Sequence, residues 1–205
     1  MSLINAALRP LADPVRAAAM SAYMRERFAF LGVPAPARRA AVKEVLRGRR
    51  QAVDWDLVDD CWARPEREFQ YVACDHLKVV PLGPDDVGRL KGLVTTKSWW
   101  DTVDALATTV GRAATADHML EWARDEDFWV RRVAIQHQLG RREATDTALL
   151  DEILTANLGS REFFINKSLG WALRDYSKTN PDWVRGFLAR HEVSALTRRE
   201  ASKYL

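Results

Sequence analysis

The stretch Trp129-Val130-Arg131-Arg132-Val133-Ala134 decides the fold class, because two other blocks of the chain resemble it. These blocks are Glu68-Phe69-Gln70-Tyr71-Val72-Ala73 and Phe164-Ile165-Asn166-Lys167-Ser168-Leu169, and the same position is Tyr71, Arg132 and Lys167 in the three. The second and third blocks in chain order begin 35 residues apart. A similarity that returns at such a spacing is typical of chains built from repeated helical units.

The residues around these blocks follow the helical period almost everywhere. The spacing of apolar residues predicts helices over 14–30, 36–48, 55–63, 66–80, 84–94, 99–114, 116–124, 127–139, 146–157, 161–177, 181–190 and 198–204. Capping boxes are expected at Ser98 with Asp101 and at Thr197 with Glu200, and Asn180 precedes a proline as an N-cap should. No alternating β-branched run suggests a hairpin.

About a dozen short helices with short loops fit either a globular bundle or an α-solenoid. The repeat favours the solenoid, although its period is somewhat below the ~40–47 residues of armadillo and HEAT repeats. We therefore expect an all-α solenoid of HEAT-like helical repeats forming one domain over residues 1–205. In a solenoid, equivalent positions line one extended concave face. Trp100, Arg132 and Trp171 follow each other by 32 and 39 residues, so we expect them side by side on that face.

Composition excludes several classes of protein. The 205 residues are 47% hydrophobic and 29% charged, which suits a soluble domain with a core. Cys61 and Cys74 match no zinc or disulfide framework, so no metal or other cofactor is expected, and a reduced, cytoplasmic setting fits best. No apolar run approaches the ~20 residues of a membrane span, and no membrane partner is expected. The net charge of +3 is compatible with nucleic acid without requiring it.

Residues 98–104, Ser-Trp-Trp-Asp-Thr-Val-Asp, concentrate aromatic rings and carboxylates in about two helical turns. Trp100 and Asp104 are four residues apart and share a helix face, whereas Trp99 points elsewhere and is expected in the core. An aromatic plate beside a carboxylate suits a site for a flat or cationic partner. It equally suits a buried tryptophan beside a solvated charge, and the sequence pattern alone leaves both readings open.

Longer motifs resemble the AlkD-type DNA alkylation-repair glycosylases, a family of HEAT-like repeat proteins. The resemblance covers roughly residues 20–205 in ordered, correctly spaced blocks. The blocks are Phe30-Leu31-Gly32-Val33 with Arg38-Arg39, then residues 65–70, Thr96-Lys97 with 98–104, Trp129-x-x-Arg132-x-Ala134-Ile135, residues 162–181 around Lys167-x-x-Gly170-Trp171, and Leu196-x-Arg198-Arg199-Glu200-Ala201.

The resemblance implies a positively charged concave groove that holds double-stranded DNA and an enzyme that excises cationic purines alkylated at N3 or N7. It also implies a role for each matching residue. Asp104 matches the catalytic carboxylate of the family, Trp100 and Trp171 its active-site aromatics, and Arg132 its active-site arginine. The protein is then expected to act as a monomer in the cytoplasm, associated with the bacterial nucleoid when bound to DNA. Lesion preference is not readable from the sequence.

The residue types suit that chemistry. A cationic purine leaves as a neutral base, so a general acid is dispensable and one carboxylate can stabilise the oxocarbenium-like sugar or orient water. Indole faces attract cations by about 0.5–2 kcal/mol, which favours alkylated over normal bases. Arg132 is expected to grip a phosphate bidentately. Further phosphate contacts, which fix position rather than sequence, are expected from Arg38, Arg39, Lys97, Lys167, Arg198 and Arg199.

Two other functions compete with excision. The chain is alternatively a non-catalytic HEAT-repeat DNA-binding protein or a protein-interaction scaffold. A scaffold predicts an apolar or acidic concave face, whereas here Arg132, Lys167 and two tryptophans are placed on it. Only activity separates the enzyme from a non-catalytic DNA-binding protein, and the presence of Asp104 with Trp100 and Trp171 favours the enzyme. The arginine-rich stretch 47–50 is interpreted as a solvated loop rather than a nucleic-acid patch.

Overall fold

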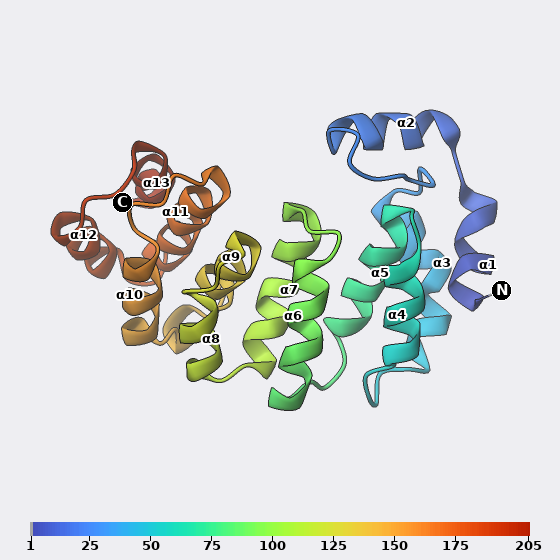
Figure 1. Cartoon of the computed structure of the whole chain (residues 1–205), viewed down its shortest axis with the longest axis horizontal. Helices are drawn as coiled ribbons and strands as arrows, with labels where there is room; N and C mark the ends of the chain where they lie inside the picture. Colours follow the sequence, from blue (N-terminus) through green and yellow to red (C-terminus); the bar gives the residue numbers. More distant parts are fainter. Residues whose placement is uncertain (1) are drawn as a thin grey trace. The chain divides into compact units, whose positions relative to one another are not determined.

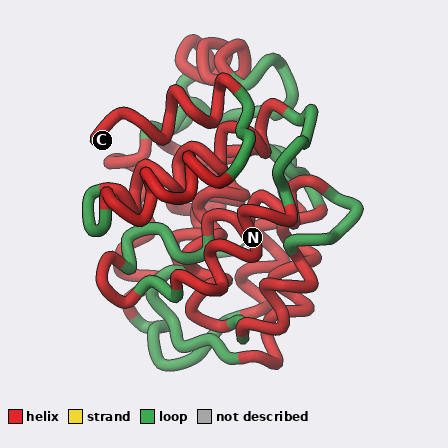
Figure 2. The backbone as a smooth tube through the Cα atoms, turned by 90° about the vertical axis from the view of Figure 1, so that its left-hand side faces the viewer, coloured by secondary structure: helices red, strands yellow, loops and turns green. Residues whose placement is uncertain are grey.

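The computed structural model describes residues 2–205, which form thirteen α-helices and four short 3₁₀ helices (Figures 1 and 2). Within this described range the only β-type pairing is an isolated bridge between Ala29 and Glu66. The expected all-α class with an α-solenoid of helical repeats is confirmed. Contacts divide the chain into two compact units, residues 1–82 (unit 1) and 83–205 (unit 2). The single domain over 1–205 stays a prediction.

Unit 1 contains five α-helices. They are α1 (Leu3–Leu8), α2 (Pro14–Tyr23), α3 (Ala35–Arg47), α4 (Trp55–Ala63) and α5 (Arg67–Leu77), with a 3₁₀ turn at Arg9–Leu11. Helix α3 packs against α1 and α5, and α4 packs against α5. The apolar residues Val42, Val58, Phe69 and Val72 are almost fully buried between these helices and form much of the core of the unit.

Glu68 at the start of α5 fixes the loop that enters α3. Its carboxylate accepts three backbone hydrogen bonds, from Leu31 at 2.9 Å, Gly32 at 2.8 Å and Val33 at 3.0 Å. The side chain is fully buried, so these bonds replace the water that the charge loses on folding. Gly32 has φ +87°, and a Cβ there would lie 2.1 Å from the Asp13 carbonyl oxygen. Only glycine therefore fits this loop position.

Unit 2 contains eight α-helices. They are α6 (Val87–Thr95), α7 (Trp100–Ala113), α8 (Ala116–Trp122), α9 (Phe128–Gln136), α10 (Thr147–Ala156), α11 (Phe163–Ser177), α12 (Pro181–Arg190) and α13 (Ala195–Ala201). The odd-numbered helices form a row in which α7 contacts α9, α9 contacts α11, and α11 contacts α13 (Figure 1). The even-numbered helices pack on this odd row, so successive helix pairs stack as repeats do.

Two glycines allow close approach within the odd row. A Cβ on Gly170 of α11 would lie 2.5 Å from the Glu200 Cβ and 3.0 Å from the Thr197 carbonyl oxygen on α13. A Cβ on Gly111 of α7 would lie 2.2 Å from the carbonyl oxygen of His137, directly after α9. Contacts below 3.0 Å are not tolerated by close-packed interiors, so these helices are as near as glycine permits. The short distance between α11 and α13 positions the side chains that flank Trp171.

Several expected helix boundaries need correction. The helix predicted over 14–30 ends at Tyr23, because Arg25 and Glu26 adopt φ of 57° and 56°, in the left-handed region. Helix α1 was not predicted at all. The helices at 55–63 and 181–190 have the predicted bounds, and the Asn180 cap is confirmed by its acceptance of a 3.0 Å hydrogen bond from the Trp183 backbone.

The two predicted capping boxes are wrong. Helix α7 has Trp99 at its N-cap with no side-chain cap, and the Ser98 hydroxyl donates back to the Val94 carbonyl at 2.7 Å. Helix α13 begins at Ala195 with Ser194 as its cap, one turn earlier than expected. Glu200 is thus free of any capping role and takes part in an ion-pair cluster described below. Among residues 2–205, no helix is long and apolar enough to cross a membrane.

Candidate functional site

Each helix of the odd row contributes one polar or aromatic side chain to a connected group in unit 2. The members are Asp104 on α7, Arg132 on α9, Trp171 on α11 and Glu200 on α13. The spacing of 28, 39 and 29 residues between them follows the repeat of helix pairs. Sequence spacing predicted that Arg132 and Trp171 would be neighbours, and the structure places the Arg132 guanidinium carbon 5.3 Å from the Trp171 ring centre.

Asp104 and Arg132 form a two-point ion pair at the centre of this group. The Arg132 Nε donates to Asp104 Oδ1 at 2.7 Å, and its Nη2 donates to Oδ2 at 2.9 Å. The third nitrogen of the guanidinium, Nη1, donates to the Phe164 carbonyl oxygen at 2.5 Å. The Arg132 side chain is 1% exposed, whereas that of Asp104 is 22% exposed. The carboxylate is therefore held at two points by a guanidinium that is shielded from solvent, while the Asp104 side chain keeps some exposure.

Gln136 completes the support of the carboxylate. It lies one turn after Arg132 on α9 and is buried. With its amide oriented so that each atom meets a complementary partner, the nitrogen donates to Asp104 Oδ1 at 3.1 Å and the oxygen accepts from Arg132 Nη2 at 3.1 Å. Burial raises the pKa of Asp104 above its ordinary value of 3.8, and the hydrogen bonds from Arg132 and Gln136 oppose that rise. Gln136 thus joins the two charged groups into one hydrogen-bonded ring.

Trp171 is flanked by cations of the protein. Besides Arg132, the Lys167 ammonium and the Arg174 guanidinium lie 5.8 Å from its ring centre. Both cations are held by the buried Glu200, at 2.7 Å from Lys167 and 3.2 Å from Arg174. Lys203 binds the same carboxylate at 2.8 Å. The Lys167 and Lys203 ammonium groups lower the pKa of Glu200 to about 2, so this cluster stays ionised and carries excess positive charge.

An aromatic cluster underlies the ion pair. The Trp99 ring lies 5.8 Å from Trp129 and 5.3 Å from Phe164, and Trp129 lies 4.8 Å from Phe164. Trp99 is buried, as predicted for a core residue, and Trp129 is buried beside it. Because the Phe164 carbonyl is also the acceptor of Arg132 Nη1, the aromatic core sets the position of the guanidinium. Trp100 is half-buried and lies one turn before Asp104 on the same helix.

That Arg132 grips a phosphate stays a prediction, and in this structure its guanidinium already has partners within the protein. All three nitrogen atoms of its guanidinium donate inside the protein, to Asp104 and the Phe164 carbonyl, and the side chain is shielded from solvent. A phosphate would have to displace a bidentate carboxylate, the strongest partner an arginine finds in a protein. The structure instead makes Arg132 a positioning residue for Asp104.

Arg38, another predicted phosphate contact, is buried and paired within unit 1, and its contact with DNA stays a prediction. It is 5% exposed, and its Nη2 lies 3.1 Å from Asp75 of α5 while its guanidinium covers the Tyr71 ring at 4.8 Å. It joins α3 to α5 in unit 1. Its neighbour Arg39 is exposed, with Nε 3.6 Å from Asp75.

The remaining predicted phosphate contacts stay predictions. Lys167 is 25% exposed and paired with Glu200. Lys97 is exposed in the loop before α7 and has φ 51°. Arg198 and Arg199 are exposed on α13, and the Arg198 Nη2 donates to the Leu188 carbonyl at 3.4 Å. All four lie in unit 2 with Asp104.

Comparison with known proteins shows the family of the chain. Residues 4–205 match the family described as DNA alkylation repair enzyme. The chain belongs to this family. A solved structure titled "Predicted DNA alkylation repair enzyme from Enterococcus faecalis" is similar, with a TM-score of 0.84 and 37% sequence identity over 95% of this chain and 96% of that one. A search of curated proteins gave no match. Membership supports a role in alkylation repair, and it implies DNA as the partner.

Sequence reasoning missed two members of the site of this alkylation-repair protein. Gln136 was not singled out, although it lies four residues after Arg132 and therefore on the same face of α9. Glu200 was assigned to a helix cap because it follows Thr197 by three residues. No local signal reveals its contact with Lys167, since 33 residues separate the two.

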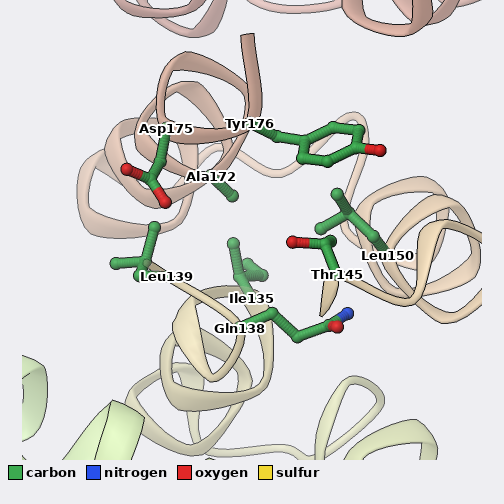
Figure 3. A pocket seen from close by; sticks show the side chains of 8 residues that line it. All are labelled: Ile135, Gln138, Leu139, Thr145, Leu150, Ala172, Asp175 and Tyr176. Atoms are coloured by element: carbon green, nitrogen blue, oxygen red, sulfur yellow. The ribbon is translucent and has the colours of Figure 1, made fainter. Parts of the chain in front are cut away.

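A small cavity elsewhere in unit 2 is not part of this site. It lies between α9, α10 and α11 and is lined by Ile135, Gln138, Leu139, Thr145, Leu150, Ala172, Asp175 and Tyr176 (Figure 3). Its volume of about 10 Å³ holds no more than one water molecule. The Gln138 amide is already bonded to the backbone of Asp146, and Asp175 accepts from the Gly140 backbone. Gln138 and Asp175 of this cavity therefore hold neighbouring loops in place.

Proposed function

We propose that the protein is a monofunctional DNA glycosylase that hydrolyses the N-glycosidic bond of cationic N3- or N7-alkylated purines in duplex DNA. One observation carries the proposal: Asp104 is held at two points by a buried arginine while its side chain stays 22% exposed. A charge fixed in this way needs no reorganisation when an opposite charge develops next to it.

The proposed reaction uses the carboxylate alone. Alkylation at N3 or N7 gives the purine a positive charge, so the base departs neutral when the glycosidic bond breaks. The positive charge then resides on the sugar as an oxocarbenium-like centre. The exposed side of Asp104 stabilises that centre or orients the water that attacks it, and the Arg132 pair keeps the carboxylate in place. No cofactor enters this reaction.

Trp100 and Trp171 supply the preference for cationic bases. Both are half-buried, so part of each indole remains accessible. A cation beside an indole face gains about 0.5–2 kcal/mol, and a normal base gains none of this. Around them, Lys97, Lys167, Arg198 and Arg199 are proposed to contact phosphates of the duplex. We further propose that the protein acts as a monomer in the cytoplasm.

Release of free base from methylated duplex DNA tests the proposed function directly. We expect the protein to liberate 3-methyladenine or 7-methylguanine under single-turnover conditions, measured by chromatography of the released base. The matched control is the same duplex without methylation, which should release nothing. If the protein bound the duplex normally but released no base, the proposed enzymatic function would be contradicted, and the result would support a non-catalytic DNA-binding protein.

The dependence of excision on pH follows from the environment of Asp104. We expect the rate to fall as pH is lowered through the pKa of this carboxyl, which lies above 3.8, because only the ionised form stabilises the sugar cation. Gln136→Leu removes a hydrogen bond to the carboxylate, so the acidic limb of the pH–rate profile should move to higher pH. If the rate were lower at every pH but the acidic limb stayed at the same pH, Gln136 would only support the fold.

A further inference from the structure

The positive charge of the chain is unevenly distributed between the two units. Residues 1–82 contain 13 lysines and arginines against 10 aspartates and glutamates, whereas residues 83–205 contain 18 of each kind. The whole net charge of +3 therefore belongs to unit 1, although Asp104 and its partners lie in unit 2. Unit 1 therefore carries the net positive charge that can attract an anionic partner.

A hollow on unit 1 gathers much of that charge. It lies between α3 and α5, has a volume of about 480 Å³, and is lined by Arg39, Ala40, Val42, Lys43, Leu46, Arg50, Asp75, Lys78 and Val79. Arg39 and Lys43 stand one turn apart on α3, and Arg50 follows the end of that helix. Lys78 approaches from the end of α5. Four cations thus surround one concave surface.

Three of these four cations are not neutralised by the protein. Asp75 is the acidic residue of the lining, and it is engaged by Arg38 at 3.1 Å and Arg39 at 3.6 Å. Within residues 2–205, none of Lys43, Arg50 and Lys78 has a carboxylate within 4.0 Å, and all three are exposed. Their neighbours differ, since Arg47 pairs with Glu44 and Arg49 with Asp54. The arginine-rich stretch 47–50 therefore divides into two paired residues and one that is open to a partner.

The floor of the hollow is apolar. Val42 and Leu46 of α3 are buried beneath the cations, and Val79 is 46% exposed at its edge. An apolar floor ringed by long cationic side chains suits a partner that presents negative charges at intervals and apolar carbon between them. A phosphodiester backbone has this pattern, with deoxyribose between phosphates. Lysine and arginine contacts of this type supply the sequence-independent part of DNA affinity.

We infer that the α3–α5 hollow is a second DNA contact, at which Lys43, Arg50 and Lys78 bind the sugar–phosphate backbone of duplex DNA whether or not it is damaged. The inference uses the partner that membership of the family implies and does not depend on excision by Asp104. Because the net charge of +3 lies in unit 1, this surface adds to the long-range attraction between the protein and DNA.

The test is the salt dependence of binding to an undamaged duplex. We compare the full chain with a triple variant, Lys43→Gln, Arg50→Gln and Lys78→Gln. Each phosphate contact contributes about 0.9 to the slope of log K against log salt concentration. The triple variant should reduce that slope by about 2–3 and weaken binding about tenfold or more at 0.1 M salt. Fluorescence anisotropy of a labelled duplex measures both quantities.

A matched control removes the same charge elsewhere. Arg124→Gln, Arg185→Gln and Arg190→Gln change three exposed arginines that are paired with Glu152, Asp182 and Asp151. This control should leave the salt slope unchanged. Equal slopes for the two triple variants, both folded by circular dichroism, would overturn the inference. Displacement of the duplex by polyglutamate as effective as that by unlabelled DNA would also overturn it, in favour of an acidic protein partner.

Failure here is distinguishable from failure of the proposed function, because undamaged DNA contains no base to excise. Single variants Lys43→Gln and Lys78→Gln guard against misfolding of the triple variant. Exposed residues without partners change the free energy of unfolding by about 0.5 kcal/mol or less. Each should reduce the slope by about 0.9, and an unchanged slope for both would contradict the inference.

Discussion

Asp104→Asn is expected to abolish most base excision while leaving the protein able to bind duplex DNA. The substitution keeps the shape of the side chain and one acceptor for Arg132, but it removes the negative charge that faces the developing sugar cation. Loss of a preorganised charge or a general base lowers rates by about 10²–10⁴-fold. Single-turnover release of methylated base measures the rate, and anisotropy measures binding.

The matched control is Asp101→Asn, three residues earlier on α7 and also half-buried. It removes the same charge from the same helix and should retain excision. If Asp104→Asn kept more than about a tenth of the wild-type rate, the carboxylate would not be the group that stabilises the transition state. If Asp101→Asn lost activity to the same degree, the loss would reflect the charge of the helix rather than one positioned side chain.

Arg132→Ala is expected to lower the free energy of unfolding by about 3–5 kcal/mol and to abolish excision. The variant leaves the Asp104 carboxylate without its counter-charge and leaves the Phe164 carbonyl without its donor. Chemical denaturation measures the stability, and the salt slope of duplex binding should stay unchanged because Arg132 contacts no phosphate in this geometry. A phosphate contact would instead reduce the slope by about 0.9.

Two companion variants separate stability from catalysis. Asp104→Leu with Arg132→Met replaces the buried pair by apolar side chains, which often restores stability. This double variant should be folded and inactive. Arg132→Lys keeps the charge but has a single donor group for the two carboxylate oxygens, so it should recover part of the excision rate. A double variant that excises bases at the wild-type rate would contradict the proposed role of the pair.

Much of the fold is readable from local sequence. The helical period located twelve of the thirteen α-helices because each has an apolar face that must be buried. The helical period did not predict where α2 ends, because the end is set by the positive φ of Arg25 and Glu26. It also failed at the starts of α7 and α13, where Ser98 and Thr197 bond to groups outside the expected caps. A hydroxyl has several acceptors in reach, and only packing selects one.

The site was predicted as a set of residues rather than as a set of contacts. Arg132 and Trp171 lie side by side as repeat spacing predicted, because it places equivalent residues on neighbouring helices, and Asp104 contacts Arg132. The contacts between these side chains were not predicted. The bidentate pair of Asp104 with Arg132 spans 28 residues, and the clamp of Glu200 on Lys167 spans 33. No pattern within one helix encodes such a distance.

The sequence by itself determined the helical class, the repeated helix pairs and the residue types at the site, since these follow from periodicity and spacing along the chain. The tertiary structure decided which charges are available to a partner. It buried Arg132 and Arg38 against Asp104 and Asp75 and left Lys43, Arg50 and Lys78 exposed. A basic side chain that lies beside a carboxylate is paired within the protein, whereas one without such a neighbour can bind a partner. Which carboxylate lies nearby is set by the packing of helices that are far apart in the chain.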